Sequence, residues 1–365
     1  MKILLSGYYG FGNVGDESVL QAIIQGLRDT DPKMEITVLS ASPNLTRELH
    51  QVNSIYRYDW LKILAKLLRT DIFVSGGGTL FQNITSNRSF LYYIGLILVA
   101  KLFWKKVAIF AQGFGPLKGR FYRLLARFVI NRVNLITLRD QNSYDEIQKL
   151  GIRRPKTYVT ADPSAILKAP SSEIGLKILG LEAIRIGRPL LGVAVRNLPQ
   201  KEEERLYKSL SETIDWLSKS YSYSPVFILF QCPEDMGATS KVINYMQEKS
   251  NIIFRMCRPD EMLALISSFD LLIGMRLHSL IFAAMNSVPM LGISYDPKVE
   301  AFMQSIEQPH FKIDQNFDFL SLNATLQSIL ANKEKIRAGL EARKKELRDR
   351  AATNFDLFFE EFKLK

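Results

Sequence analysis

Short runs of apolar residues alternate with stretches of helical periodicity along most of the chain. In the first half, the apolar runs predict buried strands at residues 3–6, 36–39, 72–75, 107–110, 135–138 and 157–160. Amphipathic patterns predict helices between them, at about 15–29, 59–69, 88–103, 119–131 and 140–149. Regular alternation of strand and helix is typical of parallel α/β units.

A second series of the same kind follows a looser stretch at residues 169–172. Its predicted strands lie at residues 190–195, 226–230, 252–254, 271–273 and 290–293. Two doubly wound halves predict an α/β fold, with two Rossmann-like domains facing each other across a cleft. Ligands of such sheets lie beyond the carboxyl ends of the strands.

The predicted domains are residues 1–170 and 171–335. The region from about 322 to 362 is a long helical pattern dense in Lys, Arg and Glu. We assign residues 336–365 to a C-terminal helix, which we expect to pack back on the first domain.

The most apolar segment, residues 90–100, ends at Lys101. A membrane span needs about 20 apolar residues, so a buried helix is predicted, with an interfacial helix as the alternative. The N-terminal apolar run is shorter than the roughly 7–15 residues of a signal-peptide core. The two cysteines, Cys232 and Cys257, form no CxxC motif, which favours a reduced, cytoplasmic compartment.

The chain has 48 Lys and Arg against 37 Asp and Glu, a net charge of +11. This excess predicts an anionic partner: nucleic acid, a membrane surface, or small phosphorylated or carboxylated molecules. The strongest basic candidate is one helix face where cations alternate with apolar residues. Its residues are Arg120, Phe121, Arg123, Leu124, Arg127 and Phe128.

No DNA- or RNA-binding motif accompanies that helix, so no nucleic-acid partner is predicted. We interpret the helix, together with the basic stretch 333–350, as a docking surface for anionic lipid headgroups. This would place the protein peripherally on the inner face of the plasma membrane. A solvated basic face is the alternative. The oligomeric state cannot be read from the sequence.

A glycine-rich loop, Gly10–Gly15, follows the first predicted strand and precedes a helix. Its GxGxxG spacing suggests a dinucleotide site, which expects an acidic residue at the end of the second strand. That strand ends at Val38–Ala41, and Glu35 lies at its start, so NAD is disfavoured. Backbone access and a helix N-terminus still suit an anion, and a tight turn capped by Asn13 is the alternative.

Two further glycine loops follow predicted strands, Gly76–Gly78 and Gln112–Pro116. Three consecutive glycines pack nothing and cost backbone entropy. A close ligand or a crossing backbone is the expected reason. Three such loops on one sheet edge outline the predicted cleft.

His278 follows the strand at 271–273 and begins the next helix. This position predicts a general acid or base, and an N-terminal cap is the alternative. Arg139, Arg276 and Lys298 also lie just after strands, where they would bind carboxylate or phosphate. A solvated surface charge is the alternative for each one alone. The other two histidines, His50 and His310, receive no role.

The sequence contains no HExxH and no cluster of Cys and His typical of a metal site. A GxSxG elbow and a Walker A lysine are also absent from it. We therefore predict no metal, and acid–base chemistry.

Together these motifs resemble the polysaccharide pyruvyl transferases, and most closely the CsaB type. The matching segments run in order, over residues 1 to about 330: Gly10–Glu17, Ser75–Asn83, Gln112–Pro116, Leu138–Asp140, Ala161–Ser164, Gly274–Ser279 and Tyr295–Lys298. The resemblance implies a GT-B-like fold and transfer of pyruvate from phosphoenolpyruvate onto a sugar as a ketal. In the CsaB type the acceptor is N-acetylmannosamine in a lipid-linked cell-wall glycan precursor, and the product helps anchor S-layer proteins.

The resemblance also assigns roles to residues. It implies catalytic roles for Arg139, His278 and Lys298, with phosphoenolpyruvate as donor substrate and no cofactor. The expected substrate-binding residues are Arg276, Gly12, Asn13, Gly15, Asp16, Gly76, Gly77, Gly78, Asn83, Gln112, Asp162 and Ser279.

The alternative enzyme is a GT-B glycosyltransferase that uses a nucleotide sugar. Many retaining members have two glutamates eight positions apart in the second domain. Here Glu300 is followed at that spacing by Gln308, and Glu307 is one position short. The product released, phosphate or nucleoside diphosphate, separates the two activities.

Overall fold

A computed structural model describes residues 1–84, 86–198, 200–313 and 317–362. The chain divides into two compact units. The first contains residues 1–167 and the chain from Leu347 onward, and the second contains Lys168–Glu346. The sequence pattern places the first boundary at 170 and the start of the C-terminal helix at 336.

The first unit is built on a parallel sheet with the strand order β3-β2-β1-β4-β6-β7-β8, and β5 pairs with β6. The strands are β1 (Lys2–Ser6), β2 (Glu35–Ser40), β3 (Asn53–Tyr56), β4 (Ile72–Ser75), β5 (Gly78–Phe81), β6 (Lys106–Phe114), β7 (Leu135–Leu138) and β8 (Lys156–Val159). The direction of winding reverses between β1 and β4. This is the topological switch point, where ligands of such sheets bind.

Helices cover both faces of this sheet because successive apolar side chains along each strand point to opposite faces, and both faces must be buried. Leu4 faces a core formed with α3 to α6, whereas Ile3 and Leu5 face a core formed with α1 and the end of α14. The helices of the unit are α1 (Val14–Thr30), α2 (Pro43–His50), α3 (Trp60–Leu68), α4 (Asn87–Leu102), α5 (Arg120–Ile130), α6 (Gln141–Lys149) and the 3₁₀ turn η1 (Pro163–Ile166).

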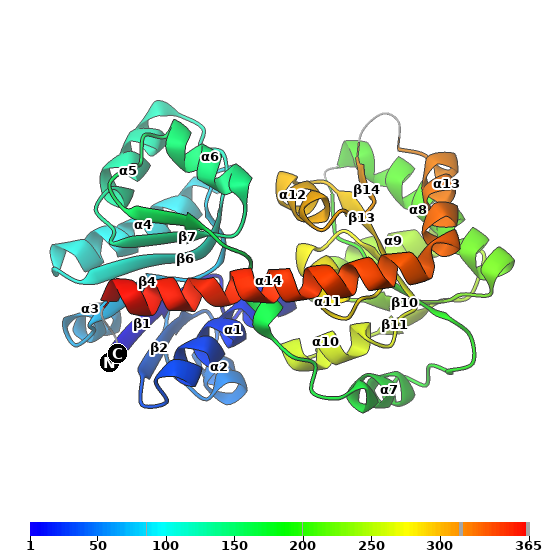
Figure 1. Cartoon of the computed structure of the whole chain (residues 1–365), viewed down its shortest axis with the longest axis horizontal. Coiled ribbons are helices and arrows are strands. Elements are labelled where there is room, and N and C mark those ends of the chain that lie inside the picture. The colour runs from blue at the N-terminus through cyan, green and yellow to red at the C-terminus, as the bar shows by residue number, and fades with distance from the viewer. Residues whose placement is uncertain (85, 199, 314–316, 363–365) are drawn as a thin grey trace. The chain divides into compact units, whose positions relative to one another are not determined.

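The last helix, α14 (Lys333–Phe362), is drawn in red in Figure 1 and completes the first unit's core. Its buried aromatic residues pack with α1 and the sheet, and the rings of Phe355 and Phe358 lie 5.2 and 5.9 Å from that of Phe110. The same helix holds the loop after β8. Asn354 Nδ2 donates to the carbonyl of Ala161 at 3.0 Å.

The second unit contains another parallel sheet, with the order β11-β10-β9-β12-β13-β14 and a switch point between β9 and β12. Its strands are β9 (Leu190–Ala194), β10 (Ser224–Ile228), β11 (Asn251–Ile253), β12 (Leu271–Gly274), β13 (Met290–Ser294) and β14 (His310–Lys312). Its helices, before α14, are α7 (Ser172–Leu181), α8 (Gln200–Tyr221), α9 (Glu234–Tyr245), α10 (Pro259–Ile266), α11 (Leu277–Met285), α12 (Pro297–Ser305) and α13 (Phe319–Ala331). Helices α8, α9 and α13 share one core with the sheet.

The predicted strands and helices are confirmed, and two of them, 72–75 and 135–138, coincide with β4 and β7. The pattern missed α2, β3, β5 and β14, and it assigned no bounds to α7 to α10 or to α12. Strands β3 and β14 are short edge strands, and β5 begins within the run of glycines. The helical stretch at 322–362 is two helices, with a break at Asn332.

The apolar segment at 90–100 belongs to α4, which buries Phe90, Tyr93, Leu96 and Ile97 in the first unit's core. The interpretation as a buried helix is therefore confirmed for this side of α4. Within the described ranges, no helix combines the length and apolar character needed to cross a membrane.

Replacing Phe358 by Ala tests the contribution of α14 to the first unit. The ring is fully buried, and removing a core Phe typically costs about 3–5 kcal/mol. We expect a loss of that size in the free energy of unfolding, measured by urea denaturation. Phe254→Ala, at an exposed Phe, is the control and should change stability by less than about 0.5 kcal/mol. Equal effects of the two substitutions would contradict the packing role.

Candidate active site

The glycine-rich loop after β1 is held by buried polar contacts. Asn13 Oδ1 accepts a hydrogen bond from the N–H of Gly15 at 2.9 Å and caps α1. Glu17 Oε1 accepts from the N–H of Gly10 at 2.7 Å, and Glu17 Oε2 lies 2.9 Å from His50 Nε2. His50, which received no role from the sequence, thus anchors the carboxylate that shapes this loop.

The glycines after β4 are explained largely by protein packing. A Cβ at Gly76 would lie 2.3 Å from the Tyr9 hydroxyl, and one at Gly77 would lie 2.6 Å from a methyl group of Val19. Gly78 differs, because its φ of 103° favours glycine and its Cβ position faces Asp16 Oδ1 at 3.4 Å. The tight packing at Gly76 and Gly77 accounts for these two residues without a ligand.

Two of the predicted substrate-binding amides hold loops together. Gln112 is fully buried, donates from Nε2 to the carbonyl of Gly76, and accepts at Oε1 from the N–H of Leu80 at 3.3 Å. Asn83 bridges to Lys118, accepting from its N–H at 2.8 Å and donating to its carbonyl at 2.9 Å. Both amides therefore support the shape of the sheet edge.

Arg139 lies directly after β7 and is buried, with only 9% of its surface exposed. Its Nη2 donates to Thr79 Oγ1 at 2.8 Å, and its Nη1 donates to Asp162 Oδ2 at 3.4 Å. Its Nε lies 3.5 Å from Asp140 Oδ2. A Cβ at Gly113 would come within 2.6 Å of Nη2, so glycine is needed there to make room for the guanidinium.

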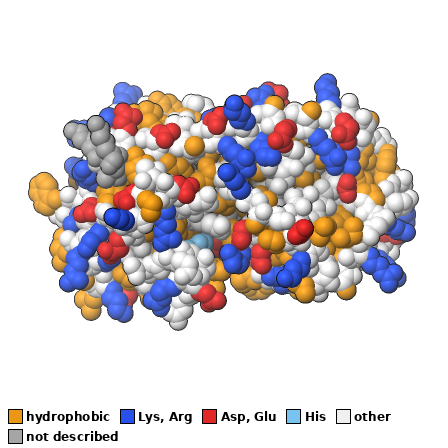
Figure 2. Space-filling view, turned by 60° about the horizontal axis from the view of Figure 1, so that its bottom comes forward, with side chains coloured by type: hydrophobic (Ala, Val, Ile, Leu, Met, Phe, Trp, Pro, Cys, Tyr) orange, Lys and Arg blue, Asp and Glu red, His pale blue; other side chains and the backbone are white. Residues whose placement is uncertain are grey.

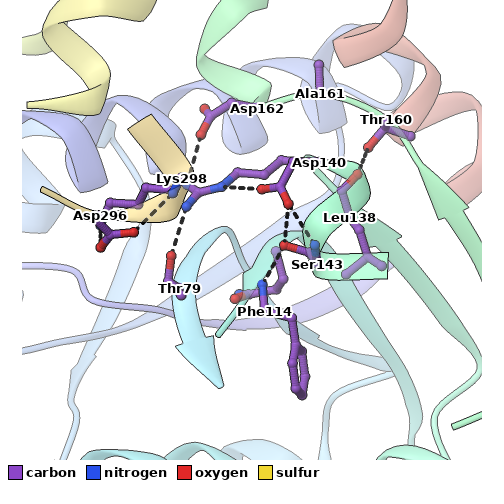
Figure 3. Close-up of polar contacts among 12 residues, drawn as sticks. Thr79, Phe114, Leu138, Asp140, Ser143, Thr160, Ala161, Asp162, Asp296 and Lys298 are labelled. Carbon is purple, nitrogen blue, oxygen red and sulfur yellow. Dashed lines mark hydrogen bonds and ion pairs between the residues drawn. The ribbon is translucent and has the colours of Figure 1, made fainter. Parts of the chain in front are cut away.

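The two aspartates beside Arg139 are fixed by their own neighbours. Asp140 Oδ1 accepts from the N–H and the hydroxyl of Ser143, each at 2.7 Å, and the N–H of Phe114 donates to Ser143 Oγ at 2.8 Å (Figure 3). Asp162 Oδ1 accepts from the N–H and the hydroxyl of Ser164 at 3.1 and 2.7 Å. The cation is thus held in a preorganised polar setting at the carboxyl end of the sheet.

In the second unit, Arg276 forms an ion pair with the buried carboxylate of Asp235. It follows β12, and its Nε lies 3.1 Å from both carboxylate oxygens of Asp235, which is 1% exposed. Asp235 Oδ2 also accepts from the N–H groups of Phe230 and Gln231 at 3.1 and 3.0 Å. The charge of Arg276 is largely balanced within the protein, although the sequence favours it as a ligand for anions.

His278 lies in the first turn of α11, where Arg276 is the N-cap residue. The imidazole is half-buried, at the carboxyl end of β12. Its neighbour Ser279 is fully buried and donates to the carbonyl of Arg276 at 2.6 Å. Ser279 thus closes the turn, and His278 is placed at the sheet edge where ligands bind.

Lys298 belongs to a group of charged and aromatic side chains after β13. Its Nζ lies 3.3 Å from Asp296 Oδ2 (Figure 3), while Asp296 Oδ1 caps α12 by accepting from the N–H of Lys298 at 3.1 Å. The guanidinium of Arg196 lies over the ring of Tyr295, 4.2 Å from its centroid, and donates to its hydroxyl. Burial raises the pKa of Tyr295, but Lys298 and Arg196 more than offset it, so the pKa lies below its ordinary value.

The structure thus distributes the predicted residues over the carboxyl ends of two sheets, one in each unit. In the first unit it brings together Arg139, Asp162 and Gly113. The side chains of Gln112 and Asn83 instead form hydrogen bonds with backbone groups of neighbouring loops. Sequence reasoning missed Thr79, Asp235, Arg196, His50 and the role of Tyr295. Tyr295 and Thr79 lie within the matched motifs, so the motifs contained a signal for them.

The family model for polysaccharide pyruvyl transferase matches residues 13–297. The amylovoran biosynthesis protein AmsJ of Erwinia amylovora is 23% identical, over 92% of this chain and 94% of its own length.

Solved structures show the fold. HepE from Anabaena, bound to UDP-glucose, has a TM-score of 0.68 at 12% identity, covering 100% of this chain and 99% of its own. The UDP-GlcNAc 2-epimerase of Neisseria meningitidis has a TM-score of 0.63 at 11% identity, with full coverage of both chains. The predicted GT-B-like fold is therefore confirmed.

The family model spans well over half of the chain, and the curated relative acts in polysaccharide synthesis. The chain belongs to the polysaccharide pyruvyl transferase family, and its role is that of a transferase in polysaccharide synthesis.

Proposed function

We propose that the protein transfers pyruvate from phosphoenolpyruvate onto two hydroxyls of a sugar in a lipid-linked glycan precursor, forming a ketal and releasing phosphate. One observation above all supports this. The three residues to which the family resemblance assigns catalysis, Arg139, His278 and Lys298, each follow the carboxyl end of a parallel strand. The family model covers the first two and ends one residue before Lys298.

Arg139 is suited to the donor's negative charge. A guanidinium has five N–H donors, and Arg139 uses Nη1 and Nη2 for Asp162 and Thr79. Its buried Nε faces Asp140 Oδ2 at 3.5 Å, and Nη1 and Nη2 each carry a second N–H. Donors therefore remain for a carboxylate or phosphate, which Arg binds in planar, bidentate geometry. Lys298, less buried, supplies a second cation as a mobile point charge.

His278 is proposed as the general acid. Its proton goes to the methylene carbon of phosphoenolpyruvate, which becomes a methyl group and leaves C2 electrophilic. One sugar hydroxyl adds to C2 and loses its proton to the imidazole. The C–O bond to phosphate then breaks, the second hydroxyl closes the ketal, and its proton leaves with the phosphate.

The acceptor is proposed by the same resemblance. The CsaB type implies N-acetylmannosamine in a lipid-linked cell-wall precursor, and hence a product that anchors S-layer proteins. AmsJ, in contrast, is named for amylovoran biosynthesis. A panel of truncated acceptor sugars, assayed for phosphate release from phosphoenolpyruvate, identifies the sugar. Release of nucleoside diphosphate from a nucleotide sugar, without phosphate release from phosphoenolpyruvate, would contradict the proposal.

Replacing His278 by Gln removes the proposed acid and keeps a polar side chain of similar size. Positioned acid–base catalysis contributes roughly 10²–10⁴-fold, so we expect kcat to fall by at least about 100-fold. The thermal midpoint should stay close to that of the wild type. His310→Gln, at a half-buried histidine on edge strand β14, is the matched control and should retain activity. Normal turnover of the His278 variant would remove it from the mechanism.

Replacing Arg139 by Lys keeps the charge and removes the planar fork. Hydrogen bonds to charged groups contribute about 1.5–3 kcal/mol, so the KM for phosphoenolpyruvate should rise by about tenfold or more. Steady-state kinetics with varied phosphoenolpyruvate measures this. Arg154→Lys, at an exposed arginine, is the control. An unchanged KM in the Arg139 variant would show that the guanidinium does not bind the donor.

Titration of Tyr295 tests the electrostatics around Lys298. Because Lys298 is the first of the charges that lower the pKa of Tyr295, Lys298→Met should raise that pKa. Absorbance at 295 nm, as the difference between each protein and its Tyr295→Phe counterpart, isolates this phenol. Lys312→Met, on β14, is the control and should leave the pKa of Tyr295 unchanged. A pKa unmoved by Lys298→Met would mean that the ammonium group does not act on the phenol.

A further inference from the structure

The positive charge of the chain is concentrated in one segment of the first unit. Between Ile72 and Arg139 there are ten Lys and Arg residues and no Asp or Glu. This segment contains α4 and α5 and accounts for almost all of the net charge of +11. Such a bias concerns the choice of partner rather than the fold.

Helix α5 has a basic and an apolar strip side by side on its outward face. Its inward face is buried through Ala126, Val129 and Ile130. At 100° per residue, the outward residues divide into two adjacent strips. The exposed residues are Arg120, Arg123 and Arg127 in one strip and Phe121, Leu124 and Phe128 in the other.

The ends of α3 and α4 extend this surface. Trp104, just after α4, is 94% exposed, and Leu102 and Leu68 are also exposed. Lys105 Nζ donates to the carbonyl of Leu68 at 3.0 Å, which joins the end of α4 to the end of α3. Lys101 Nζ donates to Asn134 Oδ1 at 3.3 Å, which joins α4 to the turn after α5. We call these exposed residues of α5 and of the two helix ends the basic–aromatic surface.

The arginines of α5 lack carboxylate partners, unlike the cations of α14. No ion pair within the described ranges involves Arg120, Arg123 or Arg127. On α14, in contrast, acids neutralise many cations, as in Arg343–Glu346 at 3.0 Å. Figure 2 shows blue and red side chains mixed over one face of the molecule. The stretch 333–350 therefore lacks the one-sided charge of α5.

We propose that the basic–aromatic surface docks on an anionic lipid bilayer. Exposed Phe, Leu and Trp side chains lose water contact at the boundary of headgroups and acyl chains. Neighbouring arginines, free of carboxylates, pair with lipid phosphates. Each cation near such a surface contributes about 1 kcal/mol. The proposal goes beyond the pyruvyl transfer proposed above and stands without it, since it concerns where the protein binds and not what it transfers.

Vesicle co-sedimentation at 0.1 M salt tests this proposal on the full chain. The probe vesicles contain neutral phosphatidylcholine with about one third phosphatidylglycerol, and pure phosphatidylcholine serves for comparison. We expect binding to the anionic vesicles and a blue shift of tryptophan emission that disappears in Trp104→Phe. The triple variant Arg120→Gln, Arg123→Gln, Arg127→Gln should bind about 100-fold more weakly, as three cations of about 1 kcal/mol each imply.

A matched triple variant, Lys177→Gln, Lys335→Gln, Lys345→Gln, removes the same charge at exposed positions elsewhere and should bind almost as the wild type does. Equal losses in the two triples, or no sedimentation with anionic vesicles, would overturn the proposal. Tighter binding to duplex RNA than to vesicles, lost in the arginine triple, would also overturn it. Turnover with a water-soluble acceptor should be unchanged in the arginine triple, so failure of docking and failure of pyruvyl transfer are distinguishable.

Discussion

The first unit's candidate site depends on the burial of one arginine. Taking a guanidinium out of water costs several kcal/mol unless carboxylates and hydrogen bonds replace the lost hydration. Arg139 meets this requirement with Asp140, Asp162 and Thr79. Gly113 leaves space for the planar group. The ends of β5, β6, β7 and β8 must therefore all be in place before this cation is stable.

The C-terminal helix enters the same arrangement from far along the chain. Asp162 follows Thr160 and Ala161, whose carbonyls accept from Arg350 and Asn354 of α14. The phenylalanines of α14 that follow cover the sheet near Phe110. The packing that stabilises the first unit thus also positions a partner of Arg139. Helix α14 therefore supports the site through the loop after β8.

The two cations of the second unit, Arg276 and Lys298, differ in how far they are paired and buried. Arg276 is paired with Asp235, whose own position is fixed by backbone N–H groups. Lys298 is less buried and shares its surroundings with Tyr295 and Asp296. A partly buried Arg276, balanced by Asp235, is suited to holding the turn that presents His278. Lys298 keeps the freedom to approach an anion, because an ammonium on a flexible stem is not fixed by a planar partner.

The sequence alone determined the strand and helix order, because apolar periodicity reports which face of each element is buried. It also placed Arg139, His278 and Lys298 after strands, since loops at the carboxyl ends of parallel strands are local features. It did not show that the Gln112 side chain donates a hydrogen bond to the carbonyl of Gly76, or that His50 pairs with Glu17.

Only the tertiary structure decided which charges are neutralised. Arg276 and Asp235 lie 41 residues apart in sequence, and Arg139 and Asp162 lie 23 apart. Such pairs form when the sheet brings the loops after different strands to one edge, and no local pattern encodes that. The same holds for α5, where no carboxylate of the described residues forms an ion pair with Arg120, Arg123 or Arg127. The sequence gives the number of charges, and the fold decides which remain available.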